Sequence, residues 1–236
     1  MMQYSQYYEE ILYPFQNKVL KVLKDCELPF YLTGGTAVSR GYLNHRYSDD
    51  LDLFVNNDFD FLSHVETALK LFEKSGFQID FADASSDSFT RIFLNRNKNG
   101  LSKNGLKIDF VNDIDVHFGE IQPTSVYYQT DSLRNILSNK YTALYRIAVK
   151  DVVDICEISK NLAFDWKDII DEANQKETGI DLKEVVHIFS SFSDEILSSV
   201  KWIKKPDLKD LRKNINTIAF DMLNEKQNSL CLNSKL

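Results

Sequence analysis

Two aspartates inside a strand-like stretch place the strongest constraint on how this chain folds. The run Asp50-Leu51-Asp52-Leu53-Phe54 alternates polar and apolar residues and predicts a strand from Asp49 to Val55. Strands are normally depleted in aspartate. The alternation places Asp50 and Asp52 on one face, roughly 6–7 Å apart along the strand, where their charges repel each other. A fold that keeps this pair must bring a cation to it, unless the pair only lines a strand end that faces solvent.

A glycine pair lies shortly before this strand. Phe30-Tyr31-Leu32 predicts a short buried strand that runs into Gly34-Gly35, and Thr36 to Tyr42 predicts a short helix. A strand, a Gly-Gly turn and a helix start present bare backbone amides, which bind phosphate readily. Glycine lets the phosphate approach the backbone without a Cβ in the way, and the Thr36 hydroxyl is expected to add a donor there.

The aspartate pair is well suited to hold Mg²⁺. This ion prefers oxygen ligands and is commonly bound by one or two carboxylates together with substrate phosphates. The predicted strand Leu106–Val111 supplies a third carboxylate, Asp109, between the apolar Ile108 and Phe110. Asp80 ranks second for that position. Asp113 and Asp115 repeat the D-x-D pattern, but we expect them in a loop or at a strand end because no glycine turn precedes them.

The chain has two differently patterned halves, which predicts an α+β protein. Residues 1–130 predict an α/β domain with a small mixed sheet flanked by helices, and residues 131–236 predict a helical domain. In the second half we expect a helix from Leu133 towards Ser159, broken at most once and capped by Asp131 or Ser132. The other helices are predicted at 15–26, 61–75, 166–175, 181–192, 194–203 and 207–226, and the helix with Phe61 and Phe72 on its apolar side is expected to end at Gly76. Further strand residues are predicted at 77–81 and 89–95, and 89–95 is expected to form a hairpin with Leu106–Val111.

Composition excludes several classes of protein. The net charge of −7 does not attract nucleic acid to the surface as a whole, although a local basic patch remains compatible with it. The three cysteines are odd in number and widely spaced, which favours free thiols over disulfides or a zinc site. The amino terminus has no signal-peptide pattern, and no apolar run has the length of a membrane span, so we expect no membrane association and a cytoplasmic protein.

Two blocks of residues resemble a known family. The first is Gly34-Gly35-Thr36-Ala37 followed by His45-Arg46-x-Ser48-x-Asp50-Leu51-Asp52-Leu53. The second is Lys140-x-x-Ala143-Leu144-x-Arg146-x-x-x-Lys150-Asp151-x-x-Asp154, with one position fewer before the arginine than the family pattern has. Together, over about residues 30 to 160, they resemble the nucleotidyltransferases of the AbiEii/AbiGii toxin family, within the polymerase-beta-like superfamily.

The resemblance implies a nucleotidyltransferase fold and a reaction. The expected enzyme transfers a nucleotide from ATP or another nucleoside triphosphate, with Mg²⁺ as the metal and Mn²⁺ as its alternative. Many members are toxins paired with an antitoxin protein, and some modify tRNA. The implied roles fall on these positions: Asp50 and Asp52 as metal ligands, Asp109 as a third carboxylate from the wider superfamily, Lys140 and Asp151 as catalytic residues, and Gly34, Gly35, Thr36, Arg46, Ser48 and Lys150 as nucleotide-binding residues.

Several alternatives stay open at this point. In an unbroken helix, Lys140, Leu144, Ile147 and Asp151 fall on one side and Arg146, Lys150 and Asp154 on another, which also fits an ordinary amphipathic helix with i, i+4 salt bridges. The acceptor is tRNA or a small molecule of the aminoglycoside type, and a third reading is a nucleotide-binding module without catalysis. Two basic segments are candidates for RNA contact or for plain solvated surface: Lys201, Lys204, Lys205, Lys209, Arg212 and Lys213, and the loop with Arg96, Lys98 and Lys103.

Overall fold

The computed structural model describes residues 4–95 and 105–233. The chain divides into two compact units. Unit 1 is Met1–Tyr42, Tyr47–His117 and Ile121–Asp131, and unit 2 is Leu43–Arg46, Phe118–Glu120 and Ser132–Leu236. The division differs from a single boundary after residue 130 because two short segments, 43–46 and 118–120, pack with the helical residues of unit 2.

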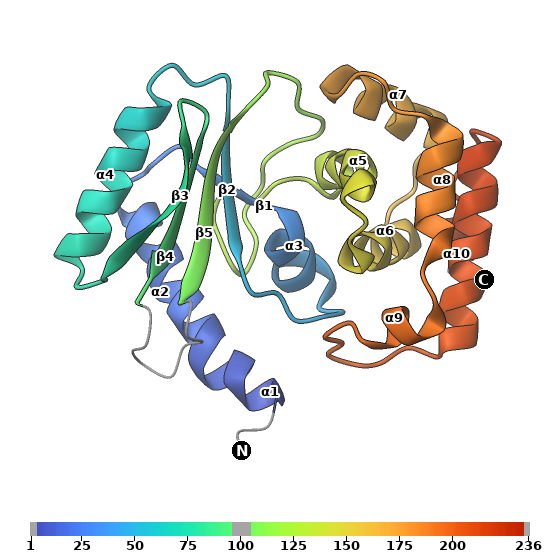
Figure 1. The fold of residues 1–236 in the computed structure, drawn as a ribbon, viewed down its shortest axis with the longest axis horizontal. Helices are drawn as coiled ribbons and strands as arrows, with labels where there is room; N and C mark the ends of the chain where they lie inside the picture. The colour runs from blue at the N-terminus through green and yellow to red at the C-terminus, as the bar shows by residue number, and fades with distance from the viewer. Residues whose placement is uncertain (1–3, 96–104, 234–236) are drawn as a thin grey trace. The chain divides into compact units, whose positions relative to one another are not determined.

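Unit 1 is built on a five-stranded mixed sheet, so the predicted sheet is confirmed (Figure 1). Its strands follow the order β1-β2-β5-β4-β3. The pair β2–β5 is parallel, and the other three pairs are antiparallel. The bounds are β1 (Tyr31–Thr33), β2 (Leu51–Asn56), β3 (Ile79–Ser86), β4 (Phe89–Leu94) and β5 (Leu106–Asp113). The predicted pairing of the strand near 89–95 with the strand near 106–111 is confirmed, whereas the loop with Arg96, Lys98 and Lys103 lies outside the described residues.

Helices cover both faces of this sheet. Figure 1 shows α4 on one side and α3 on the other. Within β2, Leu51, Leu53 and Val55 are buried, and the residues that alternate with them, Asp52 among them, are half-buried. One face of β2 is therefore apolar core, and the other carries the aspartate. The helical segments of unit 1 are α1 (Tyr4–Gln6), η1 (Tyr7–Leu12), α2 (Tyr13–Asp25), α3 (Gly34–Thr36), η2 (Ala37–Leu43) and α4 (Phe61–Lys74).

Two features of these helices follow from their sequence. Pro14 lies in the first turn of α2, where its missing N–H is tolerated. Gly76, predicted as the residue that ends the helix with Phe61 and Phe72 on its apolar side, has a φ of +84° directly after α4. Aromatic packing then closes the apolar layer, with the rings of Phe30 and Phe110 4.8 Å apart.

Unit 2 is helical and centres on α6. Its helices are α5 (Leu133–Thr142), η3 (Ala143–Arg146), α6 (Val149–Asn161), α7 (Trp166–Lys176), α8 (Leu182–Ser191), α9 (Asp194–Ser198), α10 (Leu208–Leu223) and α11 (Ser229–Asn233). Val152, Val153, Ile155 and Cys156 of α6 are all fully buried. Burial on successive residues means that α6 is enclosed on most sides, and it packs against α5, α10 and α11.

The long helix predicted from Leu133 is capped by Ser132, whose hydroxyl accepts from the Asn135 amide. It breaks at Ile147, which has a φ of +54°. The helix predicted to run to Ile203 ends earlier, at Ser198, where the indole of Trp202 donates to the Leu197 carbonyl. A side chain thus takes an acceptor that a continuing helix would have used.

Two further expectations concern the whole chain. Cys26, Cys156 and Cys231 are free thiols, as predicted. Among residues 4–95 and 105–233, the helices do not reach the combination of length and apolar character needed to cross a bilayer.

Candidate active site

A row of one polar and three charged residues runs across the sheet of unit 1. Backbone pairing aligns Thr33 of β1 with Asp52, Asp52 with Asp109 of β5, and Asp109 with Arg91 of β4. Residues paired across neighbouring strands present their side chains on the same face. The parallel β2–β5 pair therefore brings together Asp52 and Asp109, the two carboxylates that the sequence assigned to neighbouring strands.

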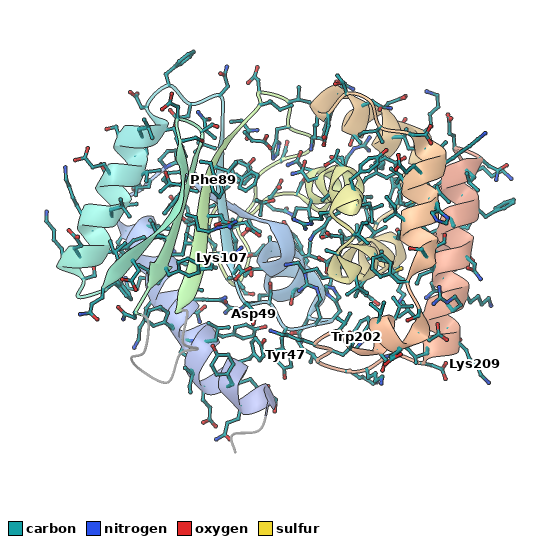
Figure 2. The ribbon with its side chains drawn as sticks, in the orientation of Figure 1. Tyr47, Asp49, Phe89, Lys107, Trp202 and Lys209 are labelled. Atoms are coloured by element: carbon teal, nitrogen blue, oxygen red, sulfur yellow. The ribbon has the colours of Figure 1, made fainter. Side chains whose placement is uncertain are left out.

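Two cations hold the carboxylates of Asp109 and Asp50. Arg91 donates two hydrogen bonds of 2.7 Å, one to each oxygen of Asp109. The ammonium of Lys107 (labelled in Figure 2) lies 3.0 Å from an oxygen of Asp50 and 3.2 Å from an oxygen of Asp109. Burial alone would raise the pKa of the Asp109 carboxyl, but Arg91 and Lys107 outweigh it and hold that pKa below its ordinary value. Asp109 is therefore ionised and bridged by both cations.

The fit of a metal ion to this cluster is partial. In the parts of the chain that the structure describes, no three carboxylate, histidine or cysteine side chains are arranged to hold a metal ion together. The reason is local, since both Asp109 oxygens already accept from Arg91 and one also contacts Lys107. Asp50, whose side chain is 30% exposed, and the half-buried Asp52 provide the two carboxylates that Mg²⁺ commonly uses beside substrate phosphates. The residues fit a two-carboxylate site better than the expected three-carboxylate one.

The conformation of Gly34 is the reason why the Gly34-Gly35 turn needs a glycine. Its φ is +65°, a left-handed conformation that side-chain-bearing residues rarely adopt, and a Cβ built on it would collide with the Asp52 carboxylate. The backbone of the turn thus lies directly against the metal-binding candidate. Gly35 has no left-handed φ, so the conformational need lies at the first glycine. The helical segment begins at Gly34 itself, two residues before the predicted start at Thr36, and continues as the π-type segment η2.

Thr36 and Ser48 hold the turn in place. The buried Thr36 hydroxyl donates to the backbone carbonyl of Asp50 and lies 2.9 Å from the Ser48 hydroxyl. In this structure the Thr36 hydroxyl fastens the turn to the start of β2, and its contact with phosphate stays a prediction. Ser48, which is also buried, shares that positioning role.

The other candidate carboxylates, Asp80, Asp113 and Asp115, lie at different places from Asp109. Asp80 lies on the edge strand β3, with β4 and β5 between it and β2, so it does not take the place of Asp109. Asp113 ends β5 and Asp115 lies in the loop that follows, as the sequence predicted.

Unit 2 contains a second charged cluster, and this one is buried. The Lys140 ammonium lies 2.6 Å from Asp151 and 2.8 Å from Asp154, and the side chains of both aspartates are 0% exposed. Arg46 donates to both oxygens of Asp154 at 2.7 Å, and the Nε2 atom of His45 is 2.9 Å from the same carboxylate. Segment 43–46 is thereby fastened to α6 through Asp154.

Opposite charges in this cluster stabilise each other's ionised forms. Burial alone would raise the pKa of Asp154, yet Arg46 and Lys140 keep it well below its ordinary value. Burial alone would lower the pKa of Lys140, and the two aspartates raise it instead. Both partners of each pair are therefore charged, with the desolvation of one offset by the charge of the other.

The break in the long helix creates this arrangement. In an unbroken helix Arg146 would lie on a different side from Lys140 and Asp151, but the helix has the one break that the sequence allowed. With the turn at Ile147, Arg146 donates 2.6 Å hydrogen bonds to both oxygens of Asp151, which also pairs with Lys140. Lys150 is exposed in the first turn of α6.

The sequence-predicted site residues therefore fall into two sets. Gly34, Gly35, Thr36, Ser48, Asp50, Asp52 and Asp109 come together in unit 1, whereas Arg46, Lys140, Lys150 and Asp151 belong to unit 2. Sequence reasoning missed Lys107 and Arg91. Lys107 carries a usable signal, because it precedes Asp109 by two positions and shares its face of the strand. His45 was assigned no role, and its contact with Asp154 has no sequence-local signal.

Comparisons with known proteins agree with this fold and with each other. No curated protein sequence matches the chain. Similar solved structures include JHP933 from Helicobacter pylori, with a TM-score of 0.57, 19% identity, and coverage of 100% of this chain and 97% of that one. A second is the "putative nucleotidyltransferase" of H. pylori, with a TM-score of 0.58, 19% identity, and coverage of 96% of this chain and 97% of that one. A third is MenT4, a nucleotidyltransferase toxin from Mycobacterium tuberculosis, with a TM-score of 0.63, 15% identity, and coverage of 91% and 83%.

At these identities the structures establish a shared fold. The family follows from the sequence, because residues 20–223 match the model of the nucleotidyl transferase AbiEii toxin of type IV toxin–antitoxin systems. That match spans the glycine turn, the aspartate strand and the Lys140 block. The chain belongs to the AbiEii family of nucleotidyltransferase toxins.

Proposed function

We propose that this nucleotidyltransferase binds a nucleoside triphosphate with Mg²⁺ at Asp50 and Asp52 and transfers the nucleotidyl group to RNA. The observation that carries the site is the close approach of the Gly34 backbone to the Asp52 carboxylate. A phosphate chain resting on the Gly34 turn would place its metal-bound oxygens beside Asp50 and Asp52. The ion supplies charge neutralisation for the reacting phosphate oxygens when it is bound.

The reaction balances without a redox partner. A hydroxyl oxygen of the acceptor forms a bond to the α-phosphorus, the bond from that phosphorus to the β-phosphate bridge breaks, and pyrophosphate leaves. The acceptor hydroxyl releases its proton to the surrounding water. Positioning and electrostatic stabilisation dominate phosphoryl-type transfers, so the residues that fix the turn and the strand matter as much as the carboxylates.

Lys107 and Arg91 extend this proposal. They already neutralise Asp50 and Asp109, at ion-pair distances of 2.7–3.2 Å. Arg91 is suited to contact the triphosphate oxygens, whereas Lys107 holds the Asp50 carboxylate that the metal ion would take over when it is bound. For Lys140 and Asp151, their mutual burial favours a positioning role in which they fix the turn between α5 and α6.

RNA as the acceptor, with tRNA as the first candidate, is supported by the family resemblance of the two sequence blocks. Membership in a type IV toxin–antitoxin family also implies a cognate antitoxin. The small-molecule acceptor and the non-catalytic module are kept as outcomes of the experiments below.

The metal site is tested by changing Asp52→Asn. Loss of one carboxylate should abolish transfer and the stabilisation by Mg²⁺ plus nucleotide, while the fold persists because a repulsive pair has been neutralised. Thermal melts in EDTA and in Mg²⁺ plus each nucleoside triphosphate provide the measurement. Asp115→Asn is the matched control, since it makes the same change in the loop after β5. Equal ligand stabilisation in wild type and Asp52→Asn would remove Asp52 from the site.

The acceptor is tested with labelled nucleotides. The protein is incubated with each labelled nucleoside triphosphate, Mg²⁺ and total RNA, and the products are resolved. Label on tRNA that disappears in Asp52→Asn supports the proposal. Label confined to an added aminoglycoside would retain the chemistry and reject the RNA acceptor. Nucleotide binding with no label on any acceptor would favour the non-catalytic module.

A further inference from the structure

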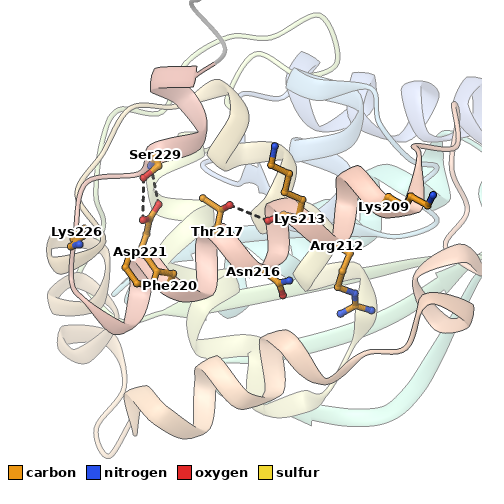
Figure 3. A pocket seen from close by; sticks show the side chains of 9 residues that line it. All are labelled: Lys209, Arg212, Lys213, Asn216, Thr217, Phe220, Asp221, Lys226 and Ser229. Carbon is orange, nitrogen blue, oxygen red and sulfur yellow. Dashed lines mark hydrogen bonds between the residues drawn. The ribbon is translucent and has the colours of Figure 1, made fainter.

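A basic hollow lies along α10 in unit 2, and its lining includes none of the residues of the two charged clusters. Its volume is about 640 Å³, and it is open to solvent on the helix surface (Figure 3). The residues that line it are Lys209, Arg212, Lys213, Asn216, Thr217, Phe220, Asp221, Lys226 and Ser229. Those from 209 to 220 recur at helical spacing and so form one face of α10.

The hollow is cationic although the chain carries a net charge of −7. Lys209 and Lys213 are exposed, and within residues 4–95 and 105–233 neither has a carboxylate at ion-pair distance. Arg212 is different, because its guanidinium is tied to Asp194 and to the Phe192 carbonyl at 2.6 Å. The two lysines can therefore bind a charged ligand, whereas the Arg212 guanidinium is engaged in contacts with Asp194 and Phe192.

The far end of the hollow offers a different surface. The Phe220 ring is 56% exposed, and the Lys226 ammonium lies 4.7 Å from its centre. The one carboxylate in the lining, Asp221, is buried and accepts from the backbone amide and hydroxyl of Ser229, as Figure 3 shows. Its charge is thus turned inward, and the surface combines cations, an amide and a hydroxyl with one open aromatic ring.

We propose that this hollow binds a single-stranded segment of RNA, with Lys209, Lys213 and Lys226 on its phosphates and Phe220 stacked on a base. The inference rests on the proposed RNA acceptor and adds a docking surface to it. A positively charged groove with an exposed aromatic side chain is the general design of single-strand binding, because every base has a stacking face. Bases in a duplex are already stacked and do not offer that face to Phe220.

The dimensions agree with a short strand. From Lys209 to Phe220 the helix rises by roughly 17 Å at about 1.5 Å per residue. At about 3.4 Å per stacked nucleotide, this length corresponds to about five nucleotides. The structure reduces the basic segment predicted from the sequence to the lysines and arginine that line the hollow. Lys201, Lys204 and Lys205 precede α10 and do not line it, whereas Lys226 does.

An acidic protein segment is the competing occupant. The lining favours RNA over it, because Phe220 is the only large apolar side chain among the lining residues and the other exposed groups are cationic or polar. Protein interfaces gain most of their stability from a desolvated apolar centre, which this hollow lacks.

The test uses the full chain and a short fluorescent polyuridine strand, with binding followed by fluorescence anisotropy at several salt concentrations. The double variant Lys209→Gln/Lys213→Gln should bind more weakly than the wild type. The magnitude of the slope of log affinity against log salt should decrease by about 1.4, because each of the two lost phosphate contacts contributes about 0.7 on a single strand. Phe220→Ala should weaken binding about fivefold or more with the salt slope unchanged, because stacking releases no counterions.

The matched control is Lys183→Gln/Lys204→Gln, which removes the same charge from exposed lysines of unit 2 outside the hollow. This control should bind like the wild type. Equal weakening in both double variants would mean general attraction and overturn the proposal, as would a wild type that binds the strand no better than a duplex of the same length. Loss of antitoxin binding by Lys209→Gln/Lys213→Gln, with polyuridine binding intact, would assign the hollow to a protein instead.

The two proposals fail separately. Asp52→Asn should abolish nucleotide transfer and leave polyuridine binding unchanged, whereas the hollow variants should leave stabilisation by Mg²⁺ plus nucleotide unchanged. Transfer to RNA that is indifferent to the hollow variants overturns only the docking surface. Polyuridine binding that depends on Lys209 and Lys213, in a protein that transfers nothing, overturns only the proposed reaction.

Discussion

The two charged clusters of this molecule use the same residue types for different ends. In unit 1, Asp50 and Lys107 have side chains that are 30% and 25% exposed. In unit 2, Asp154 and Lys140 are 0% and 5% exposed. Water and ions can reach the first cluster, so its cations are exchangeable for a ligand. In the second cluster Arg46, Lys140, Asp151 and Asp154 are buried, so the ion pairs among these four are fixed parts of the fold.

The difference shows why charge alone does not identify a site. Both clusters contain carboxylates with lowered pKa values, and both are held by lysine and arginine. A buried pair gives little net stability compared with apolar packing, but removing one partner leaves a charge without solvent or counter-ion. A half-exposed pair loses little when a partner is removed. Measuring the free energy of unfolding of single variants therefore distinguishes a binding site from a cluster that only stabilises the fold.

The largest effect is expected from Asp154→Ala. This change leaves Arg46 and Lys140 buried without their shared carboxylate, and should lower the free energy of unfolding by about 3–5 kcal/mol. Chemical denaturation measures it. Asp113→Ala, at the end of β5, is the comparison and should change stability far less. A loss for Asp154→Ala no greater than for Asp113→Ala would mean that the buried cluster is open to water.

Low pH should weaken the contribution of the same Asp154 ion pairs to the free energy of unfolding. The pKa of the folded Asp154 carboxyl lies well below the ordinary value of about 3.9, so its contribution is complete above that value and is lost as the pH falls through the lower folded value. The raised pKa of Lys140 acts only at the alkaline end, above about 10.4. Denaturation of wild type and Asp154→Asn should therefore give a stability gap that narrows as the pH falls below about 4. A gap that does not narrow in acid would contradict this assignment.

The two clusters also differ in how far the sequence predicts them. Asp50, Asp52 and Asp109 follow from period-two alternation on two strands, and Lys107 follows from the same period once Asp109 is a candidate. Arg91 depends on the register between β4 and β5, which a connecting loop of that length does not fix. The strand row was thus largely predictable, and its cations only in part.

The buried cluster was not predictable from local patterns. It depends on the turn at Ile147, a β-branched residue with a φ of +54°, where sequence rules favour a continuing helix. Packing of α6 against its neighbours overrides that local preference. The pairing of Arg46 with Asp154 joins positions far apart in the chain, and spacing does not reveal such contacts. The family resemblance marked both residues, but it did not indicate that they pair.

A smaller effect is expected at the glycine turn. Gly34→Ala adds a Cβ in a left-handed conformation, which costs about 1–2 kcal/mol, and presses it on the Asp52 carboxylate. The variant should therefore lose both stability and stabilisation by Mg²⁺ plus nucleotide. Gly76→Ala is the control, because its φ is also left-handed but no atom lies near its would-be Cβ. If both variants lose the ligand response equally, the contact between Gly34 and Asp52 does not shape the site.

The smallest change in stability, and the most direct test of exchangeability, is expected for Lys107→Met. Removing this half-exposed ammonium leaves Asp50 and Asp52 repelling each other and should lower stability by at most about 1 kcal/mol in EDTA. Mg²⁺ plus a non-hydrolysable nucleotide should then raise the melting temperature more than in wild type, because the ion supplies the missing charge and displaces no ammonium. Lys21→Met, which breaks an exposed pair with Asp25 on α2, should leave that ligand-induced shift unchanged. A shift for Lys107→Met equal to that of wild type would mean that the metal and Lys107 do not compete for Asp50. A smaller shift would place Lys107 among the groups that hold the triphosphate, and its ammonium would then serve the ligand instead of standing in for the metal.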